Sequence, residues 1–123
     1  MNEPVTVGYW SYRAWSSQWR SSIGSDYSRE TPDSNFLIVD LTLTNNDNSP
    51  SVLPPLKLMD AGGREFETTS KGMLLEGYFG PLKTVNPGVT TRGSVAFDVP
   101  QGKYYLVVSG GMTSSQSAKI ELE

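Results

Sequence analysis

Apolar residues recur at every second position in several short segments of this chain. The strongest such pattern covers residues 35–46, and its apolar parity consists of Leu37, Val39, Leu41 and Leu43. Because side chains in a strand point alternately to opposite faces, this spacing predicts a strand with one buried face. A helical period would place Asp40 and the threonines among the leucines, so the strand is favoured.

A second strand is expected within residues 86–100, because turn residues bound it at both ends. Asn86-Pro87-Gly88 is typical of a turn, and Pro100 ends the strand because proline lacks a ladder donor. One parity of this segment holds Val89, Thr91, Gly93, Val95, Phe97 and Val99. We expect the apolar sides of 37–43 and 89–99 to form opposed walls of one dry interior.

Shorter patterns complete the expected set of strands. Residues 5–15 predict a strand with a bulge at Gly8, where the apolar parity changes. Residues 56–66 predict a hairpin around a glycine turn, and 104–109 and 118–122 predict two further strands. Residues 16–34 are polar and predict a long loop with a short strand near 18–23, whereas 70–80 predict a loop or a single helical turn.

Together these elements predict an all-β protein, an immunoglobulin-like antiparallel β-sandwich of seven or eight strands. The 123 residues fit a single domain spanning residues 1–123, since domains usually hold about 100–150 residues. The turn signals recur at the spacing of a sandwich, and no internal repeat or linker interrupts them.

Composition excludes several classes of function. The chain has no cysteine and no histidine, which removes disulfides, thiolate metal sites and the commonest general base. We therefore expect no cofactor and no metal. A net charge of -3 without a basic stripe argues against nucleic-acid binding. No run of 18 apolar residues is present, so no transmembrane segment is expected.

The first residues leave the compartment open. Met1-Asn2-Glu3-Pro4 lacks the basic start and the apolar middle of a signal peptide. Two interpretations fit this composition: a cytoplasmic protein, or a mature domain to which a start methionine was added.

Four phrases in order resemble those of a known family. They are residues 7–10, 36–45 and 58–66, and the turn at 86–88 that leads into 93–100. Over about residues 7–122 the chain resembles the bacterial domain-of-unknown-function family 4352, which is related to a mycobacterial immunoprotective extracellular protein. The resemblance implies an immunoglobulin-like sandwich, secreted or lipid-anchored, with its signal segment and any lipidated cysteine upstream. It implies no catalytic residues.

Aromatic side chains are the best candidates for an interaction surface. Exposed aromatic residues are enriched where proteins bind partners. The candidates are Trp15, Trp19, Tyr27, Tyr78 and Phe79. Trp10 is assigned instead to the core, and for Trp15 and Trp19 the sequence leaves binding and core packing equally open.

Other chemistry-bearing residues are better explained by structure. The turn at 45–48 lacks the residue order of a calcium loop, and Asx residues bond their own backbone in turns. Glu65 and Glu67 share a face, which we expect to be solvated, and Ser70-Lys71 point apart on an extended chain.

The sequence therefore predicts a non-enzymatic, extracytoplasmic binding module that engages a protein or a cell-envelope component. The contacts would come from the segments 15–27 and 73–82. One alternative is a carbohydrate-binding module that uses Trp15, Trp19 and Tyr27. Another is a carboxylate-dependent hydrolase that uses Glu65 or Asp98.

Overall fold

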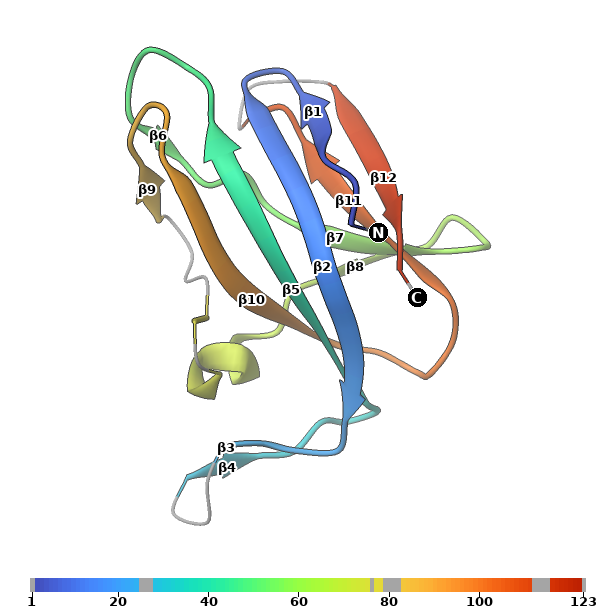
Figure 1. Cartoon of the computed structure of the whole chain (residues 1–123). Helices are drawn as coiled ribbons and strands as arrows, with labels where there is room; N and C mark the ends of the chain where they lie inside the picture. Colours follow the sequence, from blue (N-terminus) through green and yellow to red (C-terminus); the bar gives the residue numbers. More distant parts are fainter. Residues whose placement is uncertain (1, 25–27, 76, 79–82, 112–115, 123) are drawn as a thin grey trace.

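The computed structural model describes residues 2–24, 28–75, 77–78, 83–111 and 116–122 and shows two antiparallel four-stranded sheets face to face (Figure 1). The first sheet, in front in Figure 1, has the order β1-β2-β5-β10. Its strands are β1 (Val5–Val7), β2 (Trp10–Arg20), β5 (Phe36–Asn45) and β10 (Thr90–Asp98). The second sheet has the order β12-β11-β7-β8. Its strands are β12 (Ser117–Glu121), β11 (Tyr104–Ser109), β7 (Lys57–Asp60) and β8 (Glu65–Glu67).

Two small two-stranded pairs and one short helix complete the described elements. They are β3 (Ile23–Gly24) with β4 (Arg29–Glu30), β6 (Ser51–Val52) with β9 (Thr84–Val85), and the 3-10 helix η1 (Ser70–Leu74). Among the described residues, no helix is long and apolar enough to cross a membrane. The predicted all-β antiparallel sandwich is confirmed, and the helical turn expected within 70–80 is η1.

The core lies between the two sheets. Leu41 and Phe97 from the first sheet and Leu58 and Leu106 from the second are fully buried in one cluster. The predicted opposed walls are wrong in one respect, because β5 and β10 pair directly with each other. Their apolar sides therefore form one wall, and the second sheet supplies the other.

Gly8 makes a turn, which corrects the predicted bulge. The turn joins β1 to β2, pairs Val7 with Trp10, and holds Gly8 at a φ of 56°. The parity changes because the chain reverses there. A side-chain carbon at Gly8 would lie 2.8 Å from the Gly110 carbonyl oxygen, so the close approach also favours glycine.

The bulge lies instead in β2, between Ala14 and Ser16. Trp15 is the extra residue, so the inward side passes from Ala14, which pairs with Leu41, to Ser17, which pairs with Val39. The strand continues to Arg20, so the predicted loop is wrong at residues 16 and 17, and the short strand expected near 18–23 is in its first part the end of β2. The sequence pattern does not indicate a strand here, because serine and glutamine at 16–18 give no alternation of apolar and polar residues.

The lower part of the outer face carries a second apolar cluster of Ile23, Phe36, Ile38 and Ala96, with Leu75 against it. The chain around η1 also covers the free edge of β10. Thr69 N donates to Ala96 O at 2.9 Å, and Ser94 N donates to Gly77 O at 2.9 Å. The segment around η1 therefore lies along the edge of the first sheet, next to β10.

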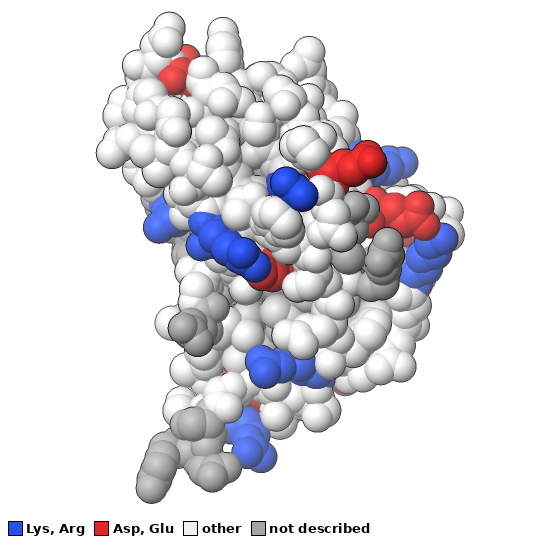
Figure 2. Space-filling model, viewed as in Figure 1, with Lys and Arg blue, Asp and Glu red and all other residues white. Residues whose placement is uncertain are grey.

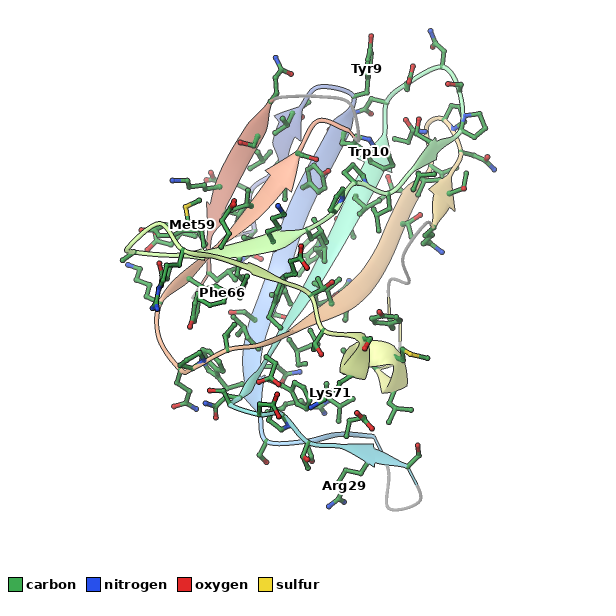
Figure 3. All side chains as sticks on the ribbon, turned by 180° about the vertical axis from the view of Figure 1, so that it is seen from behind. Tyr9, Trp10, Arg29, Met59, Phe66 and Lys71 are labelled. Carbon is green, nitrogen blue, oxygen red and sulfur yellow. The ribbon has the colours of Figure 1, made fainter. Side chains whose placement is uncertain are left out.

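Figure 3 shows the two ends of the sandwich from behind. Lys71 and Arg29 lie at the end that carries η1 and the β3–β4 pair, and Tyr9 and Trp10 lie at the other end. Lys71 Nζ donates to Thr31 O at 3.0 Å and so ties η1 to the chain after β4.

Candidate functional site

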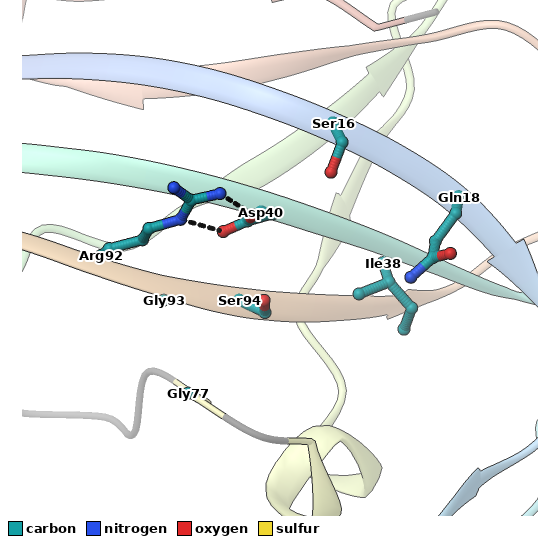
Figure 4. Close-up of a pocket in the computed structure, with 8 residues that line it drawn as sticks. All are labelled: Ser16, Gln18, Ile38, Asp40, Gly77, Arg92, Gly93 and Ser94. Atoms are coloured by element: carbon teal, nitrogen blue, oxygen red, sulfur yellow. Dashed lines mark hydrogen bonds and ion pairs between the residues drawn. The ribbon is translucent and has the colours of Figure 1, made fainter.

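A polar hollow opens on the outer face of the first sheet (Figure 4). Its volume is about 450 Å³. The lining residues come from β2, β5, β10 and the segment after η1: Ser16, Gln18, Ile38, Asp40, Gly77, Arg92, Gly93 and Ser94. Small-molecule sites commonly measure about 300–1,000 Å³, so this volume suits a small ligand.

Strand register explains why these side chains meet. Asp40 pairs with Ser16 on one side and with Ser94 on the other. Gln18 pairs with Ile38 in the next outward row. The bulge at Trp15 sets this alignment, because it turns Ser16 and Gln18 outward beside the outward residues of β5. Figure 4 shows both side chains reaching from β2 toward the strands β5 and β10.

An ion pair holds one side of the hollow. Arg92 Nη2 lies 2.7 Å from Asp40 Oδ2, and Arg92 Nε lies 3.4 Å from Asp40 Oδ1. The Arg92 side chain is 61% exposed and that of Asp40 is 27% exposed. The hydrogen bond that Arg92 donates to Asp40 raises the pKa of Arg92 above its ordinary value. The guanidinium is thus held in a fixed orientation with its charge balanced.

Trp15 lies next to this pair on the same face. Its Nε1 donates to Thr42 Oγ1 at 3.2 Å. The Arg13 guanidinium carbon lies 4.0 Å from the centre of the ring, and that of Arg92 lies 5.5 Å from it. Cations over an indole face are attracted by its negative π cloud, so the ring and the two arginines order one another. Arg13 Nε is buried and has no hydrogen-bond partner among the described residues.

Figure 2 shows this face of the molecule. Basic side chains are spread over it, and near its centre an acidic side chain lies against one of them. Arg13 and Arg92 with Asp40 give the area around Trp15 one excess positive charge, although the whole chain carries -3.

The structure separates the aromatic residues that the sequence grouped. Trp15 faces outward beside the hollow, whereas Trp19 packs against the interior, with its ring 6.2 Å from that of Tyr104. Trp10 is 2% exposed, as expected of a core residue. The two candidate tryptophans therefore lie on opposite faces of one sheet and share no surface.

Of the other three predicted surface residues, the structure describes Tyr78. Tyr78 is half-buried, follows Gly77 of the hollow and forms a parallel bridge with Ser94. Tyr27 and Phe79 lie outside the described residues. The segments 15–27 and 73–82 do approach each other in their described parts, because Ile23 and Leu75 share the outer apolar cluster.

Sequence reasoning missed the polar members of the site, Ser16, Gln18, Asp40, Arg92 and Ser94. Their signal was present, since Asp40 and Arg92 each occupy the outward parity of a predicted strand. What the sequence lacked was the order of the strands, which alone brings β10 next to β5 and β5 next to β2.

Asp98 and Glu65, the carboxylates considered for a hydrolase, lie outside the hollow. Asp98 accepts hydrogen bonds from the backbone N of Asp33 at 2.8 Å and of Ser34 at 2.9 Å. Glu65 is exposed on β8, in the second sheet, so Glu65 and Asp98 belong to different sheets. The described residues contain no group of three acidic side chains arranged to hold a metal ion.

The turn at 45–48 is organised by its own side chains. Asn45 Oδ1 accepts from Asp47 N at 2.8 Å, and Asp47 Oδ1 accepts from Asn48 N at 2.7 Å. This is the backbone bonding that Asx residues were expected to provide.

Comparison with solved structures finds the same fold at low sequence identity. The yjhA protein from Bacillus subtilis matches with a TM-score of 0.76 and 13% identity, over 100% of this chain and 98% of that one. The secreted protein MPT63 from Mycobacterium tuberculosis matches with a TM-score of 0.63 and 11% identity, over 97% of this chain and 99% of that one.

A third structure is a longer protein from Bacillus subtilis, ycdA, provisionally described as a lipoprotein. It matches with a TM-score of 0.71 and 14% identity, over 98% of this chain and 38% of that one. No curated protein matches the sequence.

The family comparison covers nearly the whole chain. A family model described as a domain of unknown function, DUF4352, matches residues 1–120. The match to MPT63 agrees with the relationship to a mycobacterial extracellular protein that the sequence phrases implied. The chain therefore belongs to the DUF4352 family.

Proposed function

We propose that this chain is a non-enzymatic, extracytoplasmic binding module that engages a cell-envelope component through the outer face of β2, β5 and β10. The recognition surface comprises Trp15, the Asp40–Arg92 pair and the polar hollow beside them. A rigid sandwich that presents an ordered surface of this kind is a common frame for recognition.

The observation that carries the proposal is the ordered cluster of Trp15, Arg13 and Arg92 beside a hollow of about 450 Å³. Tryptophan and arginine are enriched among residues that dominate binding energy. Here they stand on the sheet itself, which fixes their positions before any ligand arrives. Such preorganisation lowers the entropic cost of binding.

The extracytoplasmic location is supported by relatives. MPT63 is a secreted protein, and ycdA is provisionally a lipoprotein. Both share the fold of this chain at low identity, so the location comes to this chain by analogy. The absence of histidine and cysteine from the sequence supports a role without catalysis.

The rival functions have less support. A carbohydrate platform made of Trp15, Trp19 and Tyr27 together loses its geometry, because Trp19 packs against Tyr104 on the other face of the sheet. A hydrolase that uses Glu65 or Asp98 has less support, because Asp98 accepts hydrogen bonds from the backbone N of Asp33 and Ser34, and Glu65 is exposed on β8 outside the hollow.

Capture from cell-envelope extract tests the proposal with matched variants. Trp15→Ala removes the indole from the outer face, and Tyr9→Ala removes an aromatic residue that is 60% exposed at the far end of the sandwich. We expect wild type and Tyr9→Ala to retain the same envelope component and Trp15→Ala to lose it. Equal retention by all three, with Trp15→Ala folded, would refute this surface as the recognition site.

A further inference from the structure

We infer that the hollow binds a neutral sugar residue, which contacts the Asp40–Arg92 pair through adjacent hydroxyl groups. This inference rests on the proposed function, because it assigns the chemistry of the ligand at the same face. It uses a different set of residues from the aromatic platform that the sequence suggested.

Charge balance is the first argument. Arg92 and Asp40 are the two charged residues among the eight that line the hollow, and they are paired at 2.7 Å. An anionic ligand would have to compete with Asp40 for the guanidinium, and a cationic one would have to compete with Arg92 for the carboxylate. A neutral ligand requires neither ion to leave its partner, so a neutral ligand is favoured.

Unused hydrogen-bonding capacity is the second argument. A guanidinium carries five N–H donors and a carboxylate offers about four acceptor sites, whereas the pair uses two of each. The side chains of Ser16, Gln18 and Ser94 make no hydrogen bond to any described residue, and each can both donate and accept. The hollow therefore presents donors and acceptors side by side.

A sugar matches this arrangement because each of its hydroxyl groups also donates and accepts. One hydroxyl can accept from Arg92 while its neighbour donates to Asp40, and both ions keep their mutual bond. Hydrogen bonds to charged groups are worth more than those between neutral groups. The Asp40–Arg92 pair therefore contributes most of the preference for a ligand with two adjacent hydroxyl groups.

The apolar part of the lining is the third argument. Ile38 is 4% exposed and supports the floor of the hollow, and Gly77 and Gly93 leave room on the β10 side. The carbon-bound hydrogens of a pyranose ring can pack against such surfaces. The volume of about 450 Å³ accommodates a small ligand of this size class.

Five pyranose sugars, three neutral, one anionic and one cationic, test the inference directly. The probes are glucose, N-acetylglucosamine and galactose as neutral rings, with glucuronate and glucosamine as the anionic and cationic forms, measured by calorimetric titration. Wild type is expected to bind a neutral ring at least about tenfold more tightly than either charged form. Tighter binding of a charged form, or no binding of any neutral ring, would overturn the inference.

Asp40→Asn supplies the decisive variant, because it keeps the shape and leaves Arg92 without its counter-charge. We expect it to bind the neutral ring about tenfold more weakly or worse and to prefer glucuronate. Asp60→Asn is the matched control, since Asp60 pairs with Arg64 at 2.7 Å in a turn outside the hollow. It should bind sugars as wild type does. Unchanged sugar binding by Asp40→Asn would overturn the inference.

Ser16→Ala is a second test in case Asp40→Asn does not fold. Ser16 is exposed on β2, so its substitution should leave the fold unchanged. It should also weaken binding of the neutral ring, and an unchanged affinity would count against the hollow.

Capture from cell-envelope extract distinguishes a wrong sugar assignment from a wrong binding face. If no sugar binds but capture still depends on Trp15, the proposed face stands and the sugar assignment is wrong. If capture does not depend on Trp15, the face itself is wrong.

Discussion

At the scale of single residues, Asn45 shows how a buried amide can order a turn. It is 0% exposed, and its Nδ2 donates to Ser49 O at 3.0 Å and to Val85 O at 2.8 Å. Its Oδ1 accepts from Asp47 N. One side chain thus joins the end of β5, the following turn and β9.

Asn45→Ala should destabilise the protein by about 2–4 kcal/mol, because it leaves buried backbone groups without partners. The matched control is Asn46→Ala, whose amide is exposed and bonds Ser11 Oγ at 2.8 Å. It should change the free energy of unfolding by about 0.5 kcal/mol or less. Urea unfolding measures both, and equal effects of the two variants would contradict this role of Asn45.

Tyr12 makes stability depend on alkaline pH. It is 1% exposed, its hydroxyl donates to Ser109 O at 2.6 Å, and burial raises its pKa well above the ordinary value. Above about pH 10 the unfolded phenol loses its proton while the native one keeps it. The unfolded state then binds fewer protons, so the free energy of unfolding falls as the pH rises.

Tyr12→Phe should be less stable than wild type by about 1 kcal/mol at neutral pH, because Ser109 O loses its donor. Above about pH 10 its stability should fall less steeply than that of wild type, by about 1.4 kcal/mol per pH unit. Tyr9→Phe, at an exposed position, is the control and should follow wild type. Parallel curves for Tyr12→Phe and wild type in urea melts across this range would disprove the effect.

At the scale of elements, the bulge in β2 determines which side chains reach the hollow. Ala14 pairs with Leu41 and Ser16 pairs with Asp40, so Trp15 alone has no partner position on β5. A strand with one residue fewer at this point would keep a regular ladder. The bulge therefore adds Trp15 to the outer face and shifts the register by one residue, so that Ser16 pairs with Asp40 and faces outward.

Deletion of Trp15 should consequently leave the fold intact, at a cost of about 1 kcal/mol for its lost contacts. Deletion of Arg13 is the matched control, because it moves Trp15 to the inward position of Ala14, which is 0% exposed. Overpacking there should cost about 1–3 kcal/mol or more. Thermal unfolding compares the two deletions, and a greater loss on deleting Trp15 would contradict this description of the bulge.

The same elements show what the sequence could predict. Strict alternation in 35–46 and 89–99 identified β5 and β10, because one face of each is buried in the core. The continuity of β2 was missed, since Ser16, Ser17 and Gln18 carry no apolar alternation, and residues 18–23 were expected to form a separate short strand. The polar hollow that makes this stretch functional also removes the signal by which a strand is recognised.

At the scale of the whole molecule, the site depends on strand order. Asp40 and Arg92 are 52 residues apart, and they meet because β5 and β10 are neighbours in one sheet. Periodicity predicts which residues of a strand face outward, but it does not predict which strands are adjacent. The sandwich could therefore be predicted from sequence, and of the site only Trp15 and the segment containing Tyr78 were anticipated.

The two faces of the first sheet have different roles. The inner face packs against the second sheet to form the core, so the outer face is free to carry charged and polar groups on a rigid support. The chain around η1 bonds the edge of β10 at Ser94 and Ala96 and so bounds the hollow. Recognition on this account takes place on a sheet face, beside the loops on which sequence reasoning had placed it.

The most direct test of this account is an amide NMR titration of the labelled protein with the neutral sugar that binds most tightly. The account predicts shifts concentrated at Ser16, Gln18, Asp40, Arg92 and Ser94, with the far sheet around Leu106 unchanged. Shifts concentrated at the turn of residues 45–48 or on β8, with the hollow unaffected, would contradict it.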